Sequence, residues 1–262
     1  MTYLKFISSA FQRSAAYRLE YYTGLFNAFL YIFIFTSVWK SVWRANPGAL
    51  PGWSEDKLVQ YAILSTLIKV SFGRNENLIS NKVKTGDIVY DFLKPFSFPL
   101  MYLSDCLGVS LFQMFARALP LLGFSILFFG ISPEISGDIL LRFIPVYING
   151  LFLFFIIGLI ISSLSFFFTE TFTFYILNSA LITLLSGSVI PLNLYPDFLI
   201  PYITKTPFPY LFYFPTAIMI QAPLPLPYHE IIFNAILQTG ILSLIAWFVF
   251  SRGKQKLEFA GG

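Results

Sequence analysis

The sequence predicts an all-α, polytopic membrane protein with six transmembrane helices. Hydrophobic residues make up 56% of the 262 residues and charged residues only 11%, against roughly 25% charged residues in soluble domains. The mean hydropathy is +0.72. The stretch from Leu151 to Ile190 carries a single charge, Glu170. At ~1.5 Å per residue this run is about 60 Å long, twice the ~30 Å hydrocarbon core, so it predicts two helices joined by a turn at residues 169–171.

Six apolar runs mark the predicted spans, at residues 24–43, 58–73, 108–130, 141–168, 172–190 and 231–250. The second span is the weakest, because polar residues that include Lys69 interrupt it. The stretch 96–131 is too long for one upright helix, so an interfacial piece is expected before the third span. The whole chain, 1–262, is predicted to form one transmembrane domain.

The basic residues predict the orientation of the spans. Ten lie in the termini and the loop between the second and third spans: Lys5, Arg13, Arg18, Arg74, Lys82, Lys84, Lys94, Arg252, Lys254 and Lys256. Five lie in the opposite loops and span ends: Lys40, Arg44, Lys57, Arg142 and Lys205. Because cytoplasmic loops carry an excess of Lys and Arg, both termini are predicted to be cytoplasmic. No basic cluster is dense enough to bind nucleic acid.

Residues 1–22 are predicted to form an amphipathic helix that lies in the cytoplasmic membrane interface. One helical face carries mostly apolar and aromatic residues: Tyr3, Ile7, Ala10, Phe11, Ser14, Tyr17 and Tyr21. Charged and amide side chains, such as Arg13, lie on other faces. A short anchoring helix with no further role is the alternative.

The sequence lacks the motifs of the common catalytic and metal sites. It has no G-x-x-x-x-G-K-[ST] loop to hold phosphates, and its only histidine, His229, cannot form a two-histidine metal site. The single cysteine, Cys106, excludes an intrachain disulfide. Serines inside the spans are expected to bond to helix carbonyls or across helices. We therefore predict no catalytic residue and no metal site.

Two charged residues are candidates for functional charges inside the membrane. Arg117 lies in an apolar run, where a charge costs about 2.5–3.5 kcal/mol at the bilayer centre. It either faces an internal cavity, or pairs with Asp105 or Glu170 of a neighbouring helix, or extends its charge to the nearby membrane surface. Glu170 is the second candidate, at the turn between two spans.

A short amphipathic helix is predicted in the cytoplasmic segment 74–95. Thr85 can cap a helix, Gly86 allows a sharp turn, and Pro95 ends the helix. Apolar side chains follow at helical spacing: Ile88, Val89, Phe92 and Leu93. Such a helix suits a groove on a soluble partner. The alternative is that the same face lies on the membrane surface.

The external segment between the fifth and sixth spans is apolar and rich in proline. Nine of the sixteen prolines fall between Pro191 and Pro227. Proline breaks helices, yet an apolar segment of this kind beside a span is suited to a re-entrant or interfacial hairpin, provided that protein or a wet cavity satisfies its backbone. An ordinary amphipathic loop on the outer leaflet is the alternative.

These segments resemble the permease subunits of type-2 ATP-binding-cassette exporters, the six-span family encoded with a separate ATPase. The matching motifs are AYRLEYYTGLF near the N-terminus, TGDIVYDFLKPFSFP after the second span, and SGSVIPLNLYPDF followed by TPFPYLFYFPT before the last span. The last two, in this order, are the most specific. The resemblance covers most of the chain.

The resemblance implies roles for two sets of residues. The family's coupling helix, which sits on the ATPase, corresponds to residues 86–94: Gly86, Asp87, Ile88, Val89, Phe92, Leu93 and Lys94. Within it, Ile88, Val89, Phe92 and Leu93 would be the contacts that the ATPase buries. The family's external re-entrant hairpin corresponds to residues 191–215 and includes Pro191, Leu192, Tyr195, Pro196, Pro207, Pro209 and Pro215.

The resemblance also implies the function. The chain would be a non-catalytic permease subunit that forms a translocation route with a second, identical or related permease, in contact with membrane lipid. Two copies of a cytosolic ATPase would bind ATP and Mg, and this chain would bind no cofactor. The expected location is the bacterial plasma (inner) membrane. The alternative function is a membrane-embedded enzyme or an assembly scaffold without transport.

Overall fold

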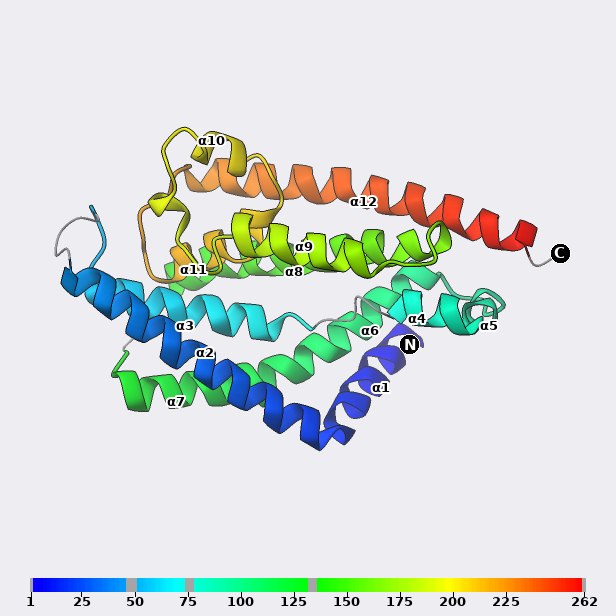
Figure 1. The fold of residues 1–262 in the computed structure, drawn as a ribbon, viewed down its shortest axis with the longest axis horizontal. Coiled ribbons are helices and arrows are strands. Elements are labelled where there is room, and N and C mark those ends of the chain that lie inside the picture. Colours follow the sequence, from blue (N-terminus) through cyan, green and yellow to red (C-terminus); the bar gives the residue numbers. More distant parts are fainter. Residues whose placement is uncertain (1, 46–50, 74–77, 132–135, 261–262) are drawn as a thin grey trace.

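The computed structural model describes residues 2–45, 51–73, 78–131 and 136–260. All of the regular secondary structure within these residues is helical. The predicted all-α class is therefore confirmed. In Figure 1 the long helices lie side by side with their axes roughly aligned, which is the arrangement of a helical membrane protein.

Four helical stretches are long and apolar enough to cross a membrane: Leu19–Ala45, Phe98–Phe129, Gly137–Phe166 and Tyr228–Lys256. The first lies within α2 (Arg18–Ala45), the third within α8 (Gly137–Ser163) and a following 3₁₀ turn (Leu164–Phe166), and the fourth within α12 (Tyr228–Ala260). These stretches match the predicted first, third, fourth and sixth spans.

The other two predicted spans are shorter helices. The second corresponds to α3 (Glu55–Ser71, 17 residues) and the fifth to α9 (Phe172–Leu185, 14 residues), about 25 and 21 Å long. The predicted end of the fifth span, at residue 190, is wrong. The helix stops at Leu185 because Gly187 takes a left-handed φ of 72° and turns the chain back into the protein.

The region before the third span also differs from the prediction. Instead of an interfacial piece followed by a span, α6 (Phe98–Gln113), a π-helical turn (Met114–Ala118) and α7 (Leu119–Phe129) form one helical path of 32 residues. Pro99 lies in the first turn of α6. Backbone N–H groups in the first turn have no partner within the helix, so the N–H that proline lacks costs nothing there. The path is about 48 Å long, so it extends well beyond a ~30 Å hydrocarbon core.

The N-terminal helix α1 (Thr2–Ala16) packs along α6. Ala10, on the predicted apolar face, is fully buried, and a Cβ at Gly108 would lie 2.3 Å from the carbonyl oxygen of Ile7. The helix ends at Ala16 rather than at residue 22, and α2 begins at Arg18. The part of the predicted face around Ala10 therefore covers protein, whereas Phe11 and Tyr17 are exposed, and the position of α1 relative to a membrane surface stays a prediction.

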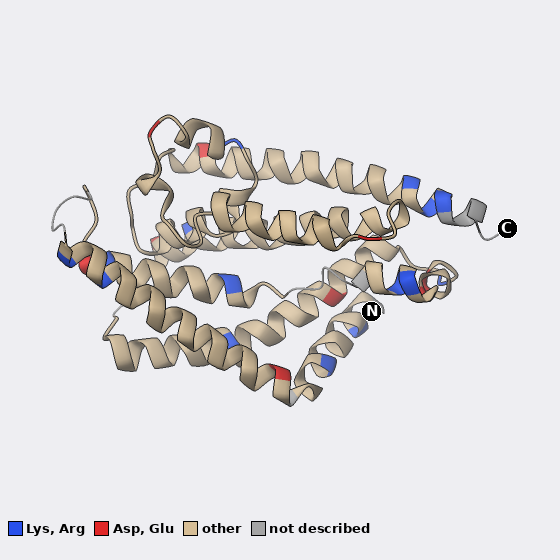
Figure 2. Ribbon diagram, in the orientation of Figure 1, with Lys and Arg blue, Asp and Glu red and all other residues tan. Residues whose placement is uncertain are grey.

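The bundle has two distinct ends (Figure 1). The start of α1, the end of α12, and the short helices α4 (Leu78–Thr85) and α5 (Ile88–Phe92) lie at one end, which we call the α5 end. The segment 191–227 lies at the other, which we call the hairpin end. Figure 2 shows that most charged residues gather toward these two ends.

Candidate functional site

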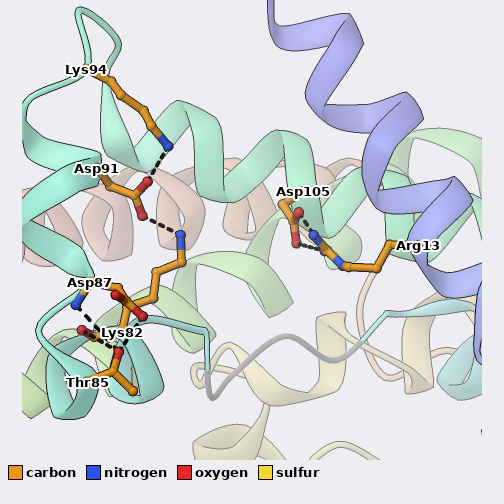
Figure 3. A network of polar contacts seen from close by, with 7 residues as sticks. All are labelled: Arg13, Lys82, Thr85, Asp87, Asp91, Lys94 and Asp105. Atoms are coloured by element: carbon orange, nitrogen blue, oxygen red, sulfur yellow. Dashed lines mark hydrogen bonds and ion pairs between the residues drawn. The ribbon is translucent and has the colours of Figure 1, made fainter.

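The helices α4 and α5 form a compact unit at the α5 end. Gly86 has a φ of 79°, a left-handed conformation that non-glycine residues rarely adopt, and it provides the turn between the two helices. Next to it, the Thr85 hydroxyl and the Asp87 carboxylate hydrogen-bond at 2.7 Å (Figure 3). The helix predicted over residues 86–94 is shorter than expected, because only Ile88–Phe92 is helical.

Asp91 joins the two helices through a buried carboxylate. Its side chain is only 4% exposed; Lys82 of α4 binds Oδ2, and the Nζ of Lys94 binds Oδ1 at 2.6 Å (Figure 3). Burial raises the pKa of Asp91, but the two ammonium groups outweigh this effect, and the pKa lies below its usual value of 3.8. Asp91 is therefore ionised at neutral pH and ties α5 to α4.

The side chains of α5 divide between an inward and an outward face. Ile88 is 1% exposed and packs in the core, and Phe92 is half-buried. Val89, Tyr90 and Leu93 are 54%, 67% and 77% exposed. Of the four predicted ATPase contacts, the structure leaves Val89 and Leu93 open to a partner, and it covers Ile88 with the protein itself.

On the inward face of α5, Phe92 packs in a cluster of four aromatic rings. The ring of Phe92 lies 5.7 Å from that of Phe98 on α6, 6.4 Å from Phe166 after α8 and 6.1 Å from Phe250 on α12. Phe98 and Phe250 stack at 5.4 Å. On the other side, Lys254 of α12 lies over the Phe92 ring at 5.4 Å. Phe92 thus links α5 to three helical segments that cross the bundle.

Two further contacts hold α4 against the turn that precedes α9. The hydroxyl groups of Ser80 and Thr171 lie 2.8 Å apart and are buried, and Lys84 pairs with Glu170 at 3.5 Å. The Glu170 side chain is 75% exposed. The helix that follows begins only at Phe172, which leaves Glu170 in the turn at the α5 end, and its position relative to the membrane stays a prediction.

Of the alternatives for Arg117, only the pairing with Asp105 or Glu170 is wrong, because both carboxylates bind other residues and Arg117 lines a cavity. Asp105 binds Arg13 of α1, with Nη2 of the arginine at 2.7 and 2.8 Å from the two carboxylate oxygens (Figure 3). Glu170 binds Lys84, as described above. Arg117 instead donates from Nη2 to the backbone oxygen of Glu20 on α2, at 2.8 Å.

The segment 191–215 returns into the protein as a hairpin. It contains 3₁₀ turns at Leu192–Leu194 and Phe208–Tyr210 and the short helix α10 (Ile200–Ile203), and it leads into α11 (Tyr213–Met219). α11 lies against α3 and α8, and the residues from Tyr210 to Phe214 are at most 1% exposed. A Cβ at Gly150 on α8 would lie 2.6 Å from the carbonyl oxygen of Tyr210. Its depth relative to the lipid stays a prediction.

Hydrogen bonds to protein groups satisfy the backbone where the hairpin enters. The Tyr61 hydroxyl on α3 donates to the oxygen of Gly187 at 2.6 Å, and Ser65 donates to the oxygen of Ser188 at 3.0 Å. The amide of Tyr213 donates to the oxygen of Ser186 at 3.1 Å. These bonds are of the kind that irregular backbone would need at membrane depth.

The predicted hairpin residues occupy two environments. Buried members are Pro191, Leu192, Pro209 and Pro215. Half-buried or exposed members are Tyr195, Pro196 and Pro207. The Tyr195 hydroxyl donates to the backbone oxygen of Leu184 at 2.5 Å, which ties the outer part of the hairpin to the end of α9.

Sequence reasoning missed Asp91 and the aromatic partners of Phe92. Asp91 could have been found from the i, i+3 spacing to Lys94. Phe98, Phe166 and Phe250 carried no such signal, because they are three of 32 phenylalanines and are far apart in the sequence.

Comparison with known proteins now adds to these observations. No match is found among curated proteins. The sequence matches the family described as ABC-2 family transporter protein over residues 25–261, almost the whole chain. This match confirms the resemblance. The long apolar helices are those of a transmembrane permease. The chain therefore belongs to the ABC-2 family and is a membrane-spanning permease of an ATP-binding-cassette exporter.

Proposed function

We propose that this permease is driven by a separate cytosolic ATPase that docks on the outward face of α5. The observation that supports this proposal is the division of α5: Val89, Tyr90 and Leu93 are exposed, while Phe92 packs on α6 and α12. An exposed apolar face on a short, firmly held helix suits a hydrophobic groove of a partner. ATP and Mg would bind at the ATPase, and this chain would bind neither.

The two faces of α5 also support a route by which a movement of the ATPase would reach the helices of the permease. A displacement of α5 by the ATPase would be passed by Phe92 to Phe98, Phe166 and Phe250, because packed cores move as units rather than deforming continuously. Asp91 with its two lysines would keep α4 and α5 moving together. The permease would thus rock against a second, identical or related permease, and cargo would pass at their interface.

A Leu93→Asp substitution is expected to reduce recovery of the ATPase with the affinity-purified permease by about tenfold or more. The change places a charge at the most exposed apolar side chain of α5, and loss of a central interface contact costs ~2 kcal/mol or more. The measurement is the amount of ATPase that co-purifies from native membranes, identified by mass spectrometry. Leu93→Met, which keeps the apolar contact, is the control and should retain the ATPase. Equal recovery with Leu93→Asp would contradict docking at this face.

We further propose that the α5 end faces the cytoplasm of a bacterial cell, with the permease in the inner membrane and both termini inside. The described basic residues favour that end: Lys5 lies at the start of α1, Lys82, Lys84 and Lys94 in or beside α4 and α5, and Arg252, Lys254 and Lys256 near the end of α12. The hairpin end carries Lys40, Arg44, Lys57, Arg142 and Lys205. The excess of positive charge supports the cytoplasmic assignment.

An impermeant maleimide should label Phe198→Cys in intact cells and should label Gln255→Cys only after the cells are opened. Phe198 lies in the hairpin segment and is 70% exposed, and Gln255 is exposed near the end of α12. Both changes are made with Cys106→Ser, so that each variant has one thiol. The reverse labelling pattern would place the α5 end outside.

The alternative function, a membrane-embedded enzyme or a scaffold, has no supporting observation in the described residues. It would need a polar cluster that gathers a buried serine with Glu170 and Arg117. Glu170 lies at the surface beside Lys84, and Arg117 lies against α2.

A further inference from the structure

A polar cavity of about 390 Å³ lies between α2, α3 and the π-helical turn, apart from both α5 and the hairpin. Its polar lining includes Glu20, Asn27, Tyr31, Lys69, Gln113 and Arg117. Lys69 lies 14 residues beyond the start of α3, about 21 Å along the helix from the hairpin end.

The π-helical turn has a definite cause in the sequence. Pro120 has no N–H to bond the carbonyl oxygen of Ala116, four residues earlier, and its ring would clash with that carbonyl in a regular helix. The helix widens over Met114–Ala118, and the Tyr21 hydroxyl on α2 donates to the freed Ala116 oxygen at 2.9 Å. Such turns inside helices occur mostly at functional sites.

Arg117 sits within this turn and is held by the backbone of α2. Its Nη2 donates to the oxygen of Glu20, and a Cβ at Gly24 would lie only 2.5–2.6 Å from the guanidinium atoms. Any residue larger than glycine at position 24 would displace the guanidinium. Gly24 and Glu20 therefore fix the position of the charge, and that hydrogen bond to Glu20 is the one that Arg117 makes among the described residues.

The cavity contains polar atoms that the described protein does not satisfy. Arg117 Nε and Gln113 Oε1 are both buried without a hydrogen-bond partner in the described part of the chain. Lys69 adds a second cation, with its Nζ 5.3 Å from the centre of the Tyr31 ring. Buried unsatisfied groups cost about 1–3 kcal/mol each, and more when charged, so a bound group that meets them is favoured.

We propose that this cavity binds an acidic group, a phosphate or carboxylate, carried by a lipid headgroup or a soluble anion. Arginine offers a planar set of donors that matches these oxyanions, and Lys69 adds a point charge. Glu20 is the one acidic residue in the part of the lining that the structure describes, where the two cations leave a net positive charge. Gln113 and Asn27 can bond to hydroxyl or ester groups beside the acid.

A second, apolar surface borders α2. A groove of about 420 Å³ runs between α2 and α7 and is lined by apolar residues that include Phe26, Phe29, Leu121 and Phe124. On α2 these groove residues lie on the face opposite the one that carries Gly24, Asn27 and Ala28 of the polar cavity. The cavity alone therefore recognises the ligand, through its acidic group.

The test is native mass spectrometry and thermal unfolding of the purified full-length permease with three probes: phosphatidylglycerol, phosphatidylcholine and inorganic phosphate. The wild-type chain should bind phosphatidylglycerol in preference to phosphatidylcholine and unfold at a higher temperature with it. Lys69→Gln and Arg117→Gln should each weaken this binding about tenfold or more, because each removes a charge-assisted contact. Lys40→Gln is the control. Lys40 also lies over an aromatic ring, that of Phe129, and it is not in the cavity lining.

The three probes separate the sources of the acid. Binding of phosphatidylglycerol but not of phosphate assigns the cavity to a lipid headgroup. Binding of inorganic phosphate without a preference between the two lipids assigns it to a soluble anion. Lys69→Gln keeps the proposal testable if Arg117→Gln fails to fold. Equal binding of the two lipids by the wild-type chain without binding of inorganic phosphate, or wild-type affinity in Lys69→Gln, would overturn the proposal. None of these outcomes depends on ATPase docking at α5.

Discussion

A Phe92→Ala permease is expected to keep its ATPase bound and to lose the response of the permease to ATP. The substitution leaves Val89, Tyr90 and Leu93 on the outward face but removes the ring that contacts Phe98, Phe166 and Phe250. The contact between α5 and the crossing helices is thereby broken. Truncation of a fully buried phenylalanine costs about 3–5 kcal/mol, and the half-buried Phe92 should cost less, so the fold should survive.

The readout is the labelling rate of Phe198→Cys at the hairpin end, measured with and without ATP in the purified complex. ATP should change this rate in the otherwise unaltered permease, and Phe92→Ala should abolish the change. Phe248→Ala is the matched control. Its ring also lies beneath a basic side chain, that of Arg252 at 5.2 Å, but it is 54% exposed and outside the cluster. An ATP response in Phe92→Ala equal to that of the control would refute transmission through this ring.

A Gly187→Ala substitution is expected to destabilise the permease by about 2–4 kcal/mol. Gly187 has a φ of 72°, where a side chain costs about 1–2 kcal/mol, and its new Cβ would lie 2.7 Å from the Cβ of Tyr213. Relief of that overlap would shift Tyr213 and weaken the bond from the Tyr61 hydroxyl to the Gly187 oxygen. The hairpin entry should therefore loosen.

Thermal unfolding in a mild detergent measures this effect. Gly123→Ala is the control, because Gly123 lies in the helix α7 and a Cβ there would meet nothing within 4 Å. That change should be neutral or stabilising by up to ~1 kcal/mol, since alanine favours helix. Equal unfolding temperatures for the two variants would show that the turn at Gly187 tolerates a side chain.

The long helices could be predicted from hydropathy, because burial in lipid demands an apolar run of fixed length. Their ends were less predictable. The end of α9 depends on the φ of Gly187, and the unbroken path from Phe98 to Phe129 depends on how Pro120 is accommodated. Neither a left-handed glycine nor a π-helical turn changes hydropathy, so a pattern of apolar residues could not show them.

The sequence predicted which segment forms the candidate site, but not which of its side chains are exposed. The helical spacing of Ile88, Val89, Phe92 and Leu93 identified the segment, yet that spacing does not show which side chains the protein itself covers. Ile88 faces inward because α5 is bound to α4 through Asp91, a contact between helices. The position of Arg117 likewise depends on α2, which is almost a hundred residues away in the sequence. Contacts of this kind are set by tertiary packing.

The most direct test of the coupling role of α5 is to purify the wild-type permease, Leu93→Asp and Phe92→Ala side by side from native membranes. Each preparation is measured for co-purifying ATPase and for the ATP-dependent change in labelling at Phe198→Cys. We predict that Leu93→Asp loses the ATPase, while Phe92→Ala keeps the ATPase and loses only the change in labelling. If both variants retain the ATPase and respond to ATP as the wild type does, α5 does not couple this permease to its ATPase.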